Sequence, residues 1–280
     1  MENTSTHFLN GTLVKENELV VSVRDLGFAR GYAVFDFLIT YPPQRPFLLE
    51  KHVDRLFRSA ELIGLSMPWS KEQLRQWVCD TLAANNDGGE KAIKITVSGG
   101  VSDSLLPSGD PTITITVDPR HTYPAEWFEK GVGVITVKHR RYCPEAKSNN
   151  YIEAVSRAQA AKNSNAIEPV YYDETQVFEG AISNIFAVIG GKLLTPGSNI
   201  LFGITREVLL QILWLDIPIE VKDFTIAELK EAQEVFLAGS NKEVVPVTQI
   251  DGTPVGDGAV GRITKEAMKQ FRDFTLSNKW

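Results

Sequence analysis

The sequence has little of what several common classes of protein require. It contains two cysteines, Cys79 and Cys143, which stand too far apart for a metal-binding or redox motif, so we expect no metal site. No apolar run approaches the roughly 20 residues that a membrane-spanning helix needs. The N-terminus lacks the basic start and apolar core of a signal peptide. We therefore expect a cytoplasmic protein without a membrane partner.

Positive charge is also scarce. The formal net charge is -6, which gives no indication of a nucleic-acid partner. The basic run Lys138-His139-Arg140-Arg141 is the one cluster of that sign. It fits a solvated strand end, or it raises the local potential for an anionic ligand. The contents of 43% hydrophobic and 23% charged residues are ordinary for a globular enzyme.

The length and the pattern of apolar residues predict two domains. A chain of 280 residues is about twice a typical domain. Residues 1–117 show strands, two helices and further strands, which predicts a smaller α+β domain. Residues 118–124 contain two prolines and no periodicity, so we place a linker there. Residues 125–280 alternate strands and helices and predict a larger α/β domain.

The individual elements follow from turn signals, helical spacing and strand alternation. In the first half we expect a Phe8–Val14 hairpin with an Asn-Gly turn, strands at 19–23, 33–40, 93–97 and 113–117, and helices at 50–65 and from Ser70. In the second half we expect strands at 132–137, 169–172, 185–189, 235–237 and 244–247, and helices at 150–162, 205–215, from Thr225 and from Arg262.

Asp36 is unusual in the expected 33–40 strand. Its neighbours Val34, Phe35, Phe37 and Leu38 are apolar, which indicates burial on both faces. A buried carboxylate needs a partner. An edge-strand Asp that faces water explains the sequence equally well.

One lysine lies where the expected strand at 132–137 gives way to the expected helix at 150–162. Lys147 at this junction could reach into a cleft and lose its solvent and its charge. The neutral amine is the form that Schiff-base chemistry requires. Taken alone, a lysine in a loop is more often a solvated surface charge.

Three features of the second half suit an anionic cofactor. Gly203-Ile204-Thr205 opens a helix, where free N–H groups and the helix dipole favour a phosphate, although a plain helix start capped by Thr205 is the simpler interpretation. Ser240-Asn241 follows a strand and forms either a second phosphate-facing loop or an ordinary turn. Glu179 precedes an apolar strand and faces either a cleft or solvent.

Together these stretches resemble the fold-type IV pyridoxal-phosphate enzymes, which include branched-chain aminotransferases, D-amino-acid aminotransferases and aminodeoxychorismate lyases. The resemblance extends from about Leu9 to Val247 and raises the expectation for Lys147. The stretches that carry it, in order, are His52-Val53-Asp54-Arg55-Leu56, Lys147-Ser148-Asn149-Asn150-Tyr151, Glu179-Gly180-Ala181-Ile182-Ser183-Asn184 and Gly203-Ile204-Thr205-Arg206.

The resemblance implies a role for each position. Lys147 would hold pyridoxal 5'-phosphate as a Schiff base and would move the proton at the substrate α-carbon. Glu179 would pair with the pyridine nitrogen of the cofactor. The phosphate would be bound by an arginine fork, a helix start and a loop, which are Arg55, Ile204, Thr205, Ser240 and Asn241. A homodimer is expected.

The resemblance leaves the substrate more open. Family members read the substrate through the segment that contains Arg30, Phe35 and Asp36 here. D-amino-acid enzymes carry Tyr and Glu where Phe35 and Asp36 align, and they use an Arg and a His in a loop near Asp103 and Leu105, which this chain lacks. Arg30 is our candidate for binding the substrate carboxylate, and a surface arginine is the alternative.

These departures predict an atypical D-amino-acid transaminase that passes the amino group to a 2-oxo acid. The stretch Asp36-Phe37-Leu38-Ile39 also departs from the Glu-Gly-Ile-Arg pattern of branched-chain enzymes. The alternatives are a branched-chain L-amino-acid aminotransferase, an aminodeoxychorismate lyase, and a catalytically silent ligand-binding protein that kept the fold.

Overall fold

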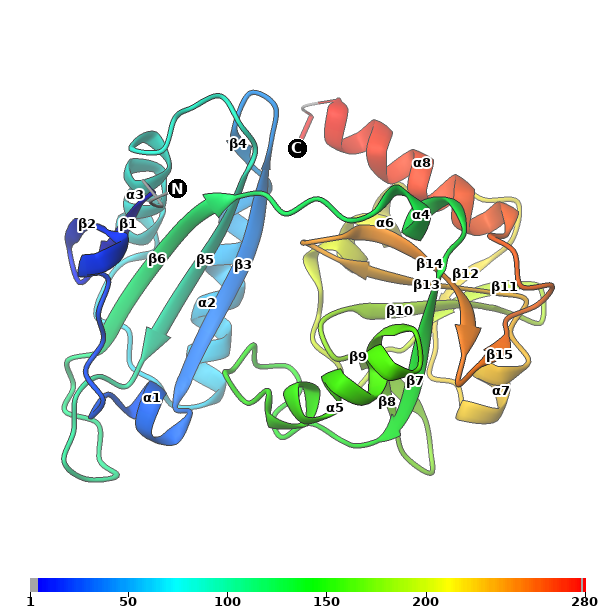
Figure 1. The fold of residues 1–280 in the computed structure, drawn as a ribbon, viewed down its shortest axis with the longest axis horizontal. Helices are drawn as coiled ribbons and strands as arrows, with labels where there is room; N and C mark the ends of the chain where they lie inside the picture. The colour runs from blue at the N-terminus through cyan, green and yellow to red at the C-terminus, as the bar shows by residue number, and fades with distance from the viewer. Residues whose placement is uncertain (1–4, 278) are drawn as a thin grey trace. The chain divides into compact units, whose positions relative to one another are not determined.

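The computed structural model describes residues 5–277 and 279–280, and these form two compact units (Figure 1). The first unit extends to His121 and also includes Glu145–Asn150. The second unit comprises Thr122–Pro144 and Tyr151–Trp280. The segment around Lys147 therefore belongs to the first unit, although its place in the sequence is in the second half. Among the residues described, no helix has both the length and the apolar character needed to cross a membrane.

The first unit is built on a six-stranded antiparallel sheet with the order β2-β1-β6-β5-β3-β4. Its strands are β1 (Thr6–Leu9), β2 (Thr12–Lys15), β3 (Ala33–Tyr41), β4 (Arg45–Pro46), β5 (Lys91–Ser98) and β6 (Thr112–Pro119). The expected hairpin is confirmed: its turn residues Asn10 and Gly11 both have positive φ angles, as a tight two-residue hairpin requires.

Two helices cover one face of this sheet, α2 (Leu49–Leu62) and α3 (Lys71–Ala83) (Figure 1). Their apolar stripes pack on the alternate residues of β3, β5 and β6 that point toward them, including Val34, Leu38, Ile93 and Ile95. The Ser70 side chain accepts a hydrogen bond from the Gln73 N–H at the start of α3, as the sequence predicts.

The expected strand at 19–23 is wrong. A short 3₁₀ helix (Glu16–Glu18) is followed by irregular chain, and α1 (Leu26–Arg30) then begins with Asp25 as its N-cap. Val20 and Val23 are exposed. A strand needs a hydrogen-bonded neighbour, and these residues have none in the sheet order above, whatever their intrinsic preference.

The second unit is built on a nine-stranded mixed sheet with the order β12-β11-β10-β13-β14-β7-β8-β9, and β15 pairs with β14. The strands are β7 (Val132–Lys138), β8 (Ala166–Tyr172), β9 (Val177–Gly180), β10 (Asn184–Ile189), β11 (Lys192–Thr195), β12 (Ile219–Val221), β13 (Glu234–Gly239), β14 (Glu243–Ile250) and β15 (Thr253–Pro254). The central strands are buried on both faces and supply the core.

The helices of the second unit are α4 (Ala125–Glu129), α5 (Ile152–Asn163), α6 (Ile204–Ile212), α7 (Ile226–Lys230) and α8 (Arg262–Leu276). Thr225 and Glu228 form the capping box that the sequence predicts for α7. Helix α6 begins after Gly203 rather than with a Thr205 cap, and it ends at Ile212 because Leu213 adopts an extended conformation. The mixed α/β fold expected from the sequence is confirmed.

Residues 145–150 extend the first sheet at the edge of β3. The Phe35 N–H donates to the Lys147 carbonyl at 2.9 Å, and the Asn149 N–H donates to the Ala33 carbonyl at 3.0 Å. Val34 and Ser148 form an antiparallel bridge between these bonds. In the segment expected as a linker, β6 continues to Pro119. The edge pairing fixes the backbone of Lys147 against the strand that carries Phe35 and Asp36.

Candidate active site

In the first unit, Lys147 is held by its backbone, and its side chain lies beside an aromatic ring. The Lys147 N–H donates to Ser59 Oγ at 3.1 Å, and Ser59 Oγ donates in turn to the Arg55 carbonyl on α2. The Lys147 Nζ lies 4.6 Å from the centre of the Phe35 ring. Phe35, Lys147 and the helix that carries Arg55 therefore meet at one end of β3, although they are far apart in the sequence.

Asp36 points toward α2 and is completely buried. Its two oxygens accept hydrogen bonds from Arg55, at 2.9 Å from Nε and at 2.8 Å from Nη2, and Oδ1 also lies 2.6 Å from His52 Nδ1. The β3 alternation turns this side chain into the core, and a substrate contact at Asp36 stays a prediction that none of these contacts supports. Its observed role is to hold Arg55.

The charges of this cluster shift two pKa values. Burial opposes ionisation of Asp36, but the charges and hydrogen bonds of Arg55 and His52 outweigh it and hold the pKa of Asp36 well below its usual range. Burial lowers the pKa of His52, and Arg55 and Lys147 add to the lowering, against the opposing effect of Asp36. Within the described residues, His52 Nε2 has no hydrogen-bond partner, so a proton there would be a buried, unsatisfied donor. A neutral His52 ring that donates from Nδ1 to Asp36 accounts for both the lowered pKa and the unpartnered Nε2.

This cluster predicts a loss of stability in mild acid. The unfolded chain binds a proton at His52 as the pH falls below about 6.5, whereas the folded chain, with its lowered pKa, does not. The stabilisation is therefore complete above that pH and declines below it, by at most about 1.4 kcal/mol per pH unit. The lowered pKa of Asp36 adds a second decline at lower pH.

The measurement is the melting temperature between pH 8 and pH 5. We expect His52→Asn, which can still donate to Asp36, to flatten the decline near pH 6, and the exposed His121→Asn to leave it unchanged. Equal slopes in the wild type and His52→Asn would contradict a neutral His52.

Arg55 retains free donors for a ligand. Its pairing with Asp36 uses Nε and Nη2, so at least two of the five guanidinium N–H groups make no hydrogen bond within the described part of the chain. The side chain is 12% exposed. An arginine that is oriented by a buried carboxylate and keeps an open edge suits a phosphate group.

In the second unit, Glu179 is buried and held at both oxygens. Oε1 lies 2.9 Å from Arg141 Nη1, while Oε2 accepts from Asn184 Nδ2 at 3.2 Å and from the Leu201 N–H at 3.0 Å. The sequence did not single out Arg141 or Asn184 as site residues. The basic run at 138–141 was the available signal for Arg141.

Asn184 also holds the segment of chain that leads into α6. Its Nδ2 donates to the Leu201 carbonyl at 2.8 Å, and its Oδ1 would lie 1.9 Å from a Cβ placed on Gly203. Gly203 has φ -69° and ψ 137°, which any residue can adopt. The glycine is therefore required by the closeness of Asn184 and not by its backbone conformation.

Gly203→Ala is expected to displace Asn184 and with it the hold on Glu179. We predict a loss of cofactor affinity on the order of tenfold, the equivalent of one lost hydrogen bond. The measurement is titration of the cofactor-free protein with pyridoxal 5'-phosphate. Asn184→Ala should cause a similar loss, and the double variant should be no worse than either, because both changes act through one side chain. Strictly additive losses would contradict this coupling.

The first turn of α6 and the β13–β14 turn offer donors that are not used. The N–H groups of Ile204 and Thr205 lie at the helix start, where no helical carbonyl reaches them. Across the described chain, neither the Thr205 hydroxyl nor the Ser240 hydroxyl has a hydrogen-bond partner. Helix α6 packs on β13, which leads directly to Ser240. Asn241 instead donates to the Tyr123 hydroxyl at 2.8 Å.

Arg206, also missed from the sequence, has a supporting place here. It is buried, and it donates from Nε to Thr195 Oγ1 at 3.1 Å and from Nη2 to the Pro196 carbonyl at 2.8 Å. Burial lowers its pKa, with Glu179 and Asp223 opposing the shift. These bonds anchor the first turn of α6 to the end of β11.

Arg30 lies apart from these clusters in its contacts. It ends α1, is exposed, and donates from Nη1 to the neighbouring Ala29 carbonyl at 2.8 Å. No hydrogen bond or ion pair joins it to Phe35, Lys147 or Arg55 in the described residues. Its binding of a substrate carboxylate stays a prediction.

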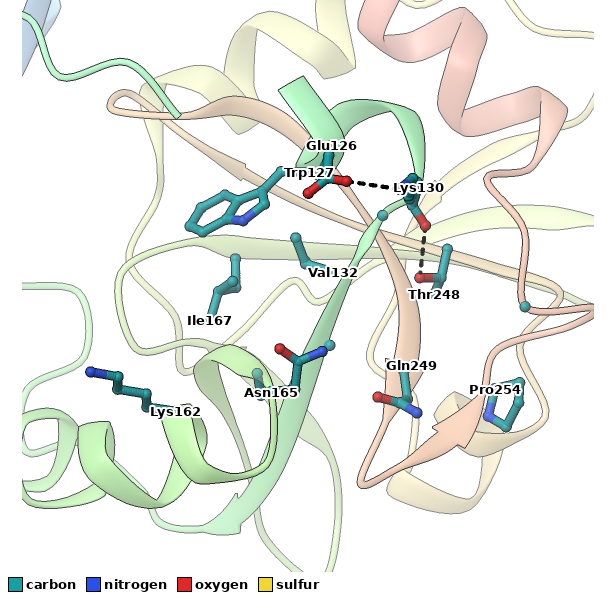
Figure 2. Close-up of a pocket in the computed structure, with 14 residues that line it drawn as sticks. Glu126, Trp127, Lys130, Val132, Lys162, Asn165, Ile167, Thr248, Gln249 and Pro254 are labelled. Atoms are coloured by element: carbon teal, nitrogen blue, oxygen red, sulfur yellow. Dashed lines mark hydrogen bonds and ion pairs between the residues drawn. The ribbon is translucent and has the colours of Figure 1, made fainter. Parts of the chain in front are cut away.

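A cavity of roughly 600 Å³ lies on the second unit beside β7 and β14 (Figure 2). Trp127, Val132 and Ile167 form its apolar wall, and Lys162 and Asn165 line another side. Glu126 and Lys130 are paired with each other at 2.7 Å, and Thr248 Oγ1 donates to the Lys130 carbonyl. None of the site residues expected from the sequence lines this cavity.

A matching family model and several relatives place the chain among known proteins. Residues 33–250 match the model of the amino-transferase class IV family. The chain belongs to the class IV aminotransferases. These enzymes use pyridoxal 5'-phosphate and act on amino acids and 2-oxo acids. Each unit offers groups of the kind that such a cofactor needs, an amine and an arginine in the first unit and a carboxylate and an open helix start in the second.

Among these aminotransferases, the relatives divide between two substrate classes. A Methanocaldococcus jannaschii protein, provisionally named a branched-chain-amino-acid aminotransferase, is 35% identical over 98% of this chain and 96% of its own. A D-alanine aminotransferase of Staphylococcus epidermidis is 33% identical over 97% of this chain and 98% of its own. The structure of a T.th. branched-chain amino acid aminotransferase with pyridoxamine 5'-phosphate has a TM-score of 0.90 at 26% identity, covering 100% of this chain and 96% of that one.

Proposed function

We propose that this aminotransferase takes its amino group from a D-amino acid of the alanine or glutamate type and passes it to a 2-oxo acid. The proposal of a working transaminase depends on the placement of Lys147. Two hydrogen bonds fix its backbone, a third fixes that of Asn149 beside it, and its amine lies beside Phe35. The D-alanine aminotransferase relatives support the D-amino acid. So does the departure of Asp36-Phe37-Leu38-Ile39 from the branched-chain pattern.

Each residue contributes a separate part of the chemistry. Pyridoxal 5'-phosphate, when bound, supplies an electron sink for the negative charge that develops at the substrate α-carbon. Lys147 would hold the cofactor through Nζ, and its free amine would then move the proton at the substrate α-carbon. Rigid support of its backbone by Ser59 and β3 lets the flexible side chain move while the segment stays in place.

Glu179 is assigned to the ring nitrogen. Asn184 and the Leu201 N–H hold one oxygen of the carboxylate and Arg141 holds the other, so the carboxylate that would pair with a protonated nitrogen is fixed in place. Arg55, Ile204, Thr205, Ser240 and Asn241 are assigned to the phosphate. Arg55 would supply its unused guanidinium donors, and the α6 start and Ser240 would supply the free N–H and hydroxyl groups described above.

A branched-chain L-amino acid is the second candidate substrate. It is supported by the Methanocaldococcus jannaschii relative and by the Thermoproteus uzoniensis branched-chain aminotransferase crystallised with norvaline, which has a TM-score of 0.90 at 30% identity. We also propose that the chain forms a homodimer, which light scattering of the purified protein tests directly.

A half-reaction screen distinguishes the candidates. The protein loaded with pyridoxal 5'-phosphate is mixed separately with D-alanine, D-glutamate, L-leucine and (R)-1-phenylethylamine, and the absorbance of the bound cofactor is followed. Rapid conversion by D-alanine or D-glutamate alone is the result expected. Conversion by L-leucine but not by either D-amino acid would replace the proposal with the branched-chain activity. A spectrum that none of the amines changes would contradict both.

A further inference from the structure

The turn that carries Ser240 is held by side chains at two of its positions. It joins β13 to β14, and the Lys242 N–H closes it by donating to the Gly239 carbonyl at 3.2 Å. The Lys242 ammonium group is held in a buried ion pair. Asn241 Nδ2 donates to the Tyr123 hydroxyl at 2.8 Å. Tyr123 lies 118 positions earlier in the chain, near the start of the second unit, so this bond joins the turn to a distant segment.

The same turn has backbone donors that remain available for a ligand. Ser240 and Asn241 are its two central residues, and the bond that closes the turn uses neither of their N–H groups. Within residues 5–277 and 279–280, these two N–H groups make no other hydrogen bond. Consecutive N–H groups in a turn form a concave site for an anion. Their directions depend on the conformation of the turn, so a contact that fixes the turn also fixes these donors.

Tyr123 is itself held by an aromatic neighbour. Its ring is stacked on that of Trp127, with 5.0 Å between the ring centres and 26° between the ring planes. Trp127 belongs to α4, packs against the core of the second unit and forms part of the cavity wall (Figure 2). The stacking restrains the Tyr123 ring, and the Tyr123 hydroxyl is therefore a well-placed acceptor for the Asn241 amide. The amide in turn lies close over the turn, because its Oδ1 would be 3.4 Å from a Cβ placed on Gly239.

We propose that Tyr123 is a positioning residue for the binding of the cofactor phosphate. Its hydroxyl holds the Asn241 amide, and the amide keeps the turn at Ser240 and Asn241 in one conformation. Tyr123 acts through Asn241 and is assigned no contact with the phosphate. The inference rests on the proposed function, because it takes this turn as part of the phosphate site. Without the Tyr123 hydroxyl, the turn would have to be ordered when the phosphate binds, and that ordering costs affinity.

The test compares pyridoxal 5'-phosphate with pyridoxal, which lacks the phosphate. Each is titrated into the cofactor-free full-length protein, and the ratio of the two Kd values measures what the phosphate contributes. Tyr123→Phe keeps the stacked ring and removes the hydroxyl. Asn241→Ala removes the same hydrogen bond from its other end and keeps the backbone N–H. Tyr172→Phe on β8 is the matched control, because the Tyr172 hydroxyl makes no hydrogen bond in the described part of the chain.

We expect Tyr123→Phe to raise the Kd of pyridoxal 5'-phosphate by about threefold to tenfold, the equivalent of one lost hydrogen bond, and to leave the Kd of pyridoxal unchanged. Trp127→Leu, which removes the stacking, should cause a selective loss in the same direction. Tyr123→Phe added to Asn241→Ala should cause no further loss, because both changes remove one hydrogen bond. Tyr172→Phe should bind both ligands as the wild type does.

Two results with Tyr123→Phe would overturn the inference. An equal loss of affinity for both ligands would mean that Tyr123 supports the fold of the second unit rather than the phosphate site. Unchanged Kd values for both would mean that its hydroxyl positions nothing. A wild-type protein that binds pyridoxal as tightly as pyridoxal 5'-phosphate would instead contradict the phosphate assignment of the proposed function, and the inference would fail with it.

Discussion

Lys147→Ala is expected to abolish amino transfer, with a fall in turnover on the order of 10⁴-fold or more, because one side chain both attaches the cofactor and moves the proton. The change should leave the fold intact. The bonds from the Lys147 segment to Ser59, Phe35 and Ala33 are all made by backbone atoms, which alanine retains. The variant is thus expected to fold and to bind pyridoxal 5'-phosphate without holding it covalently.

Borohydride reduction followed by mass spectrometry measures the covalent bond independently of activity. The wild-type chain should gain the mass of one cofactor at Lys147, and Lys147→Ala should gain none. Lys147→Arg separates charge from chemistry, since arginine keeps a cation but is always protonated and cannot attack a carbonyl. Lys162→Ala, an exposed lysine of α5, is the control for the same kind of substitution. Near wild-type turnover in Lys147→Ala would remove Lys147 from the mechanism.

The sequence predicts those parts of the site that depend on local pattern. The helical spacing of α2, the start of α6 and the position of Lys147 between β7 and α5 could all be read from short stretches. The face on which Lys94 lies was also available, because Ile93 and Ile95 flank it in an alternating strand. The sequence does not predict that Lys94 lies beside the Phe35 ring, because Phe35 belongs to another strand.

The sequence could not predict the contacts that join distant segments. The alternation of β3 allows Asp36 to point to either face, and only the packing of α2 decides that it pairs with Arg55 and His52. The edge pairing of Ser148 with Val34 joins residues more than a hundred positions apart. Likewise, the exposed residues at 19–23 are apolar enough for a strand, but the sheet offers them no place. Such outcomes depend on tertiary packing, which local preference does not contain.

A buried ion pair in the second unit joins two parts of the candidate site. Glu168 on β8 accepts from the Ile182 N–H at 2.9 Å and from Ser183 Oγ at 2.7 Å, in the turn between Glu179 and Asn184. Its other partner is the Lys242 Nζ, in the turn that carries Ser240. Both charged side chains are almost fully buried, with 3% and 2% of their surface exposed. The pair therefore holds the turn after Glu179 and the Ser240 turn in one arrangement.

Lys242→Met is expected to destabilise the protein by about 3–5 kcal/mol, because it leaves a buried carboxylate without its counter-charge. It should also weaken the binding of pyridoxal 5'-phosphate by releasing the Ser240 turn. The measurements are thermal unfolding of the loaded protein and cofactor titration. Lys192→Met removes a lysine whose pair with Glu220 is largely solvated, and it should cost less than about 1 kcal/mol.

The double variant Lys242→Met with Glu168→Leu separates the two roles of the pair. Removing both charges replaces an ion pair with apolar packing, which often restores stability. The Ile182 N–H and the Ser183 hydroxyl would then lose their acceptor, so the turn after Glu179 should stay loosened. We therefore expect stability to recover in part while cofactor affinity stays low. If stability and cofactor affinity both recover in the double variant, the ion pair acts on stability alone. A Lys242→Met variant as stable as the wild type would contradict the burial of the ion pair.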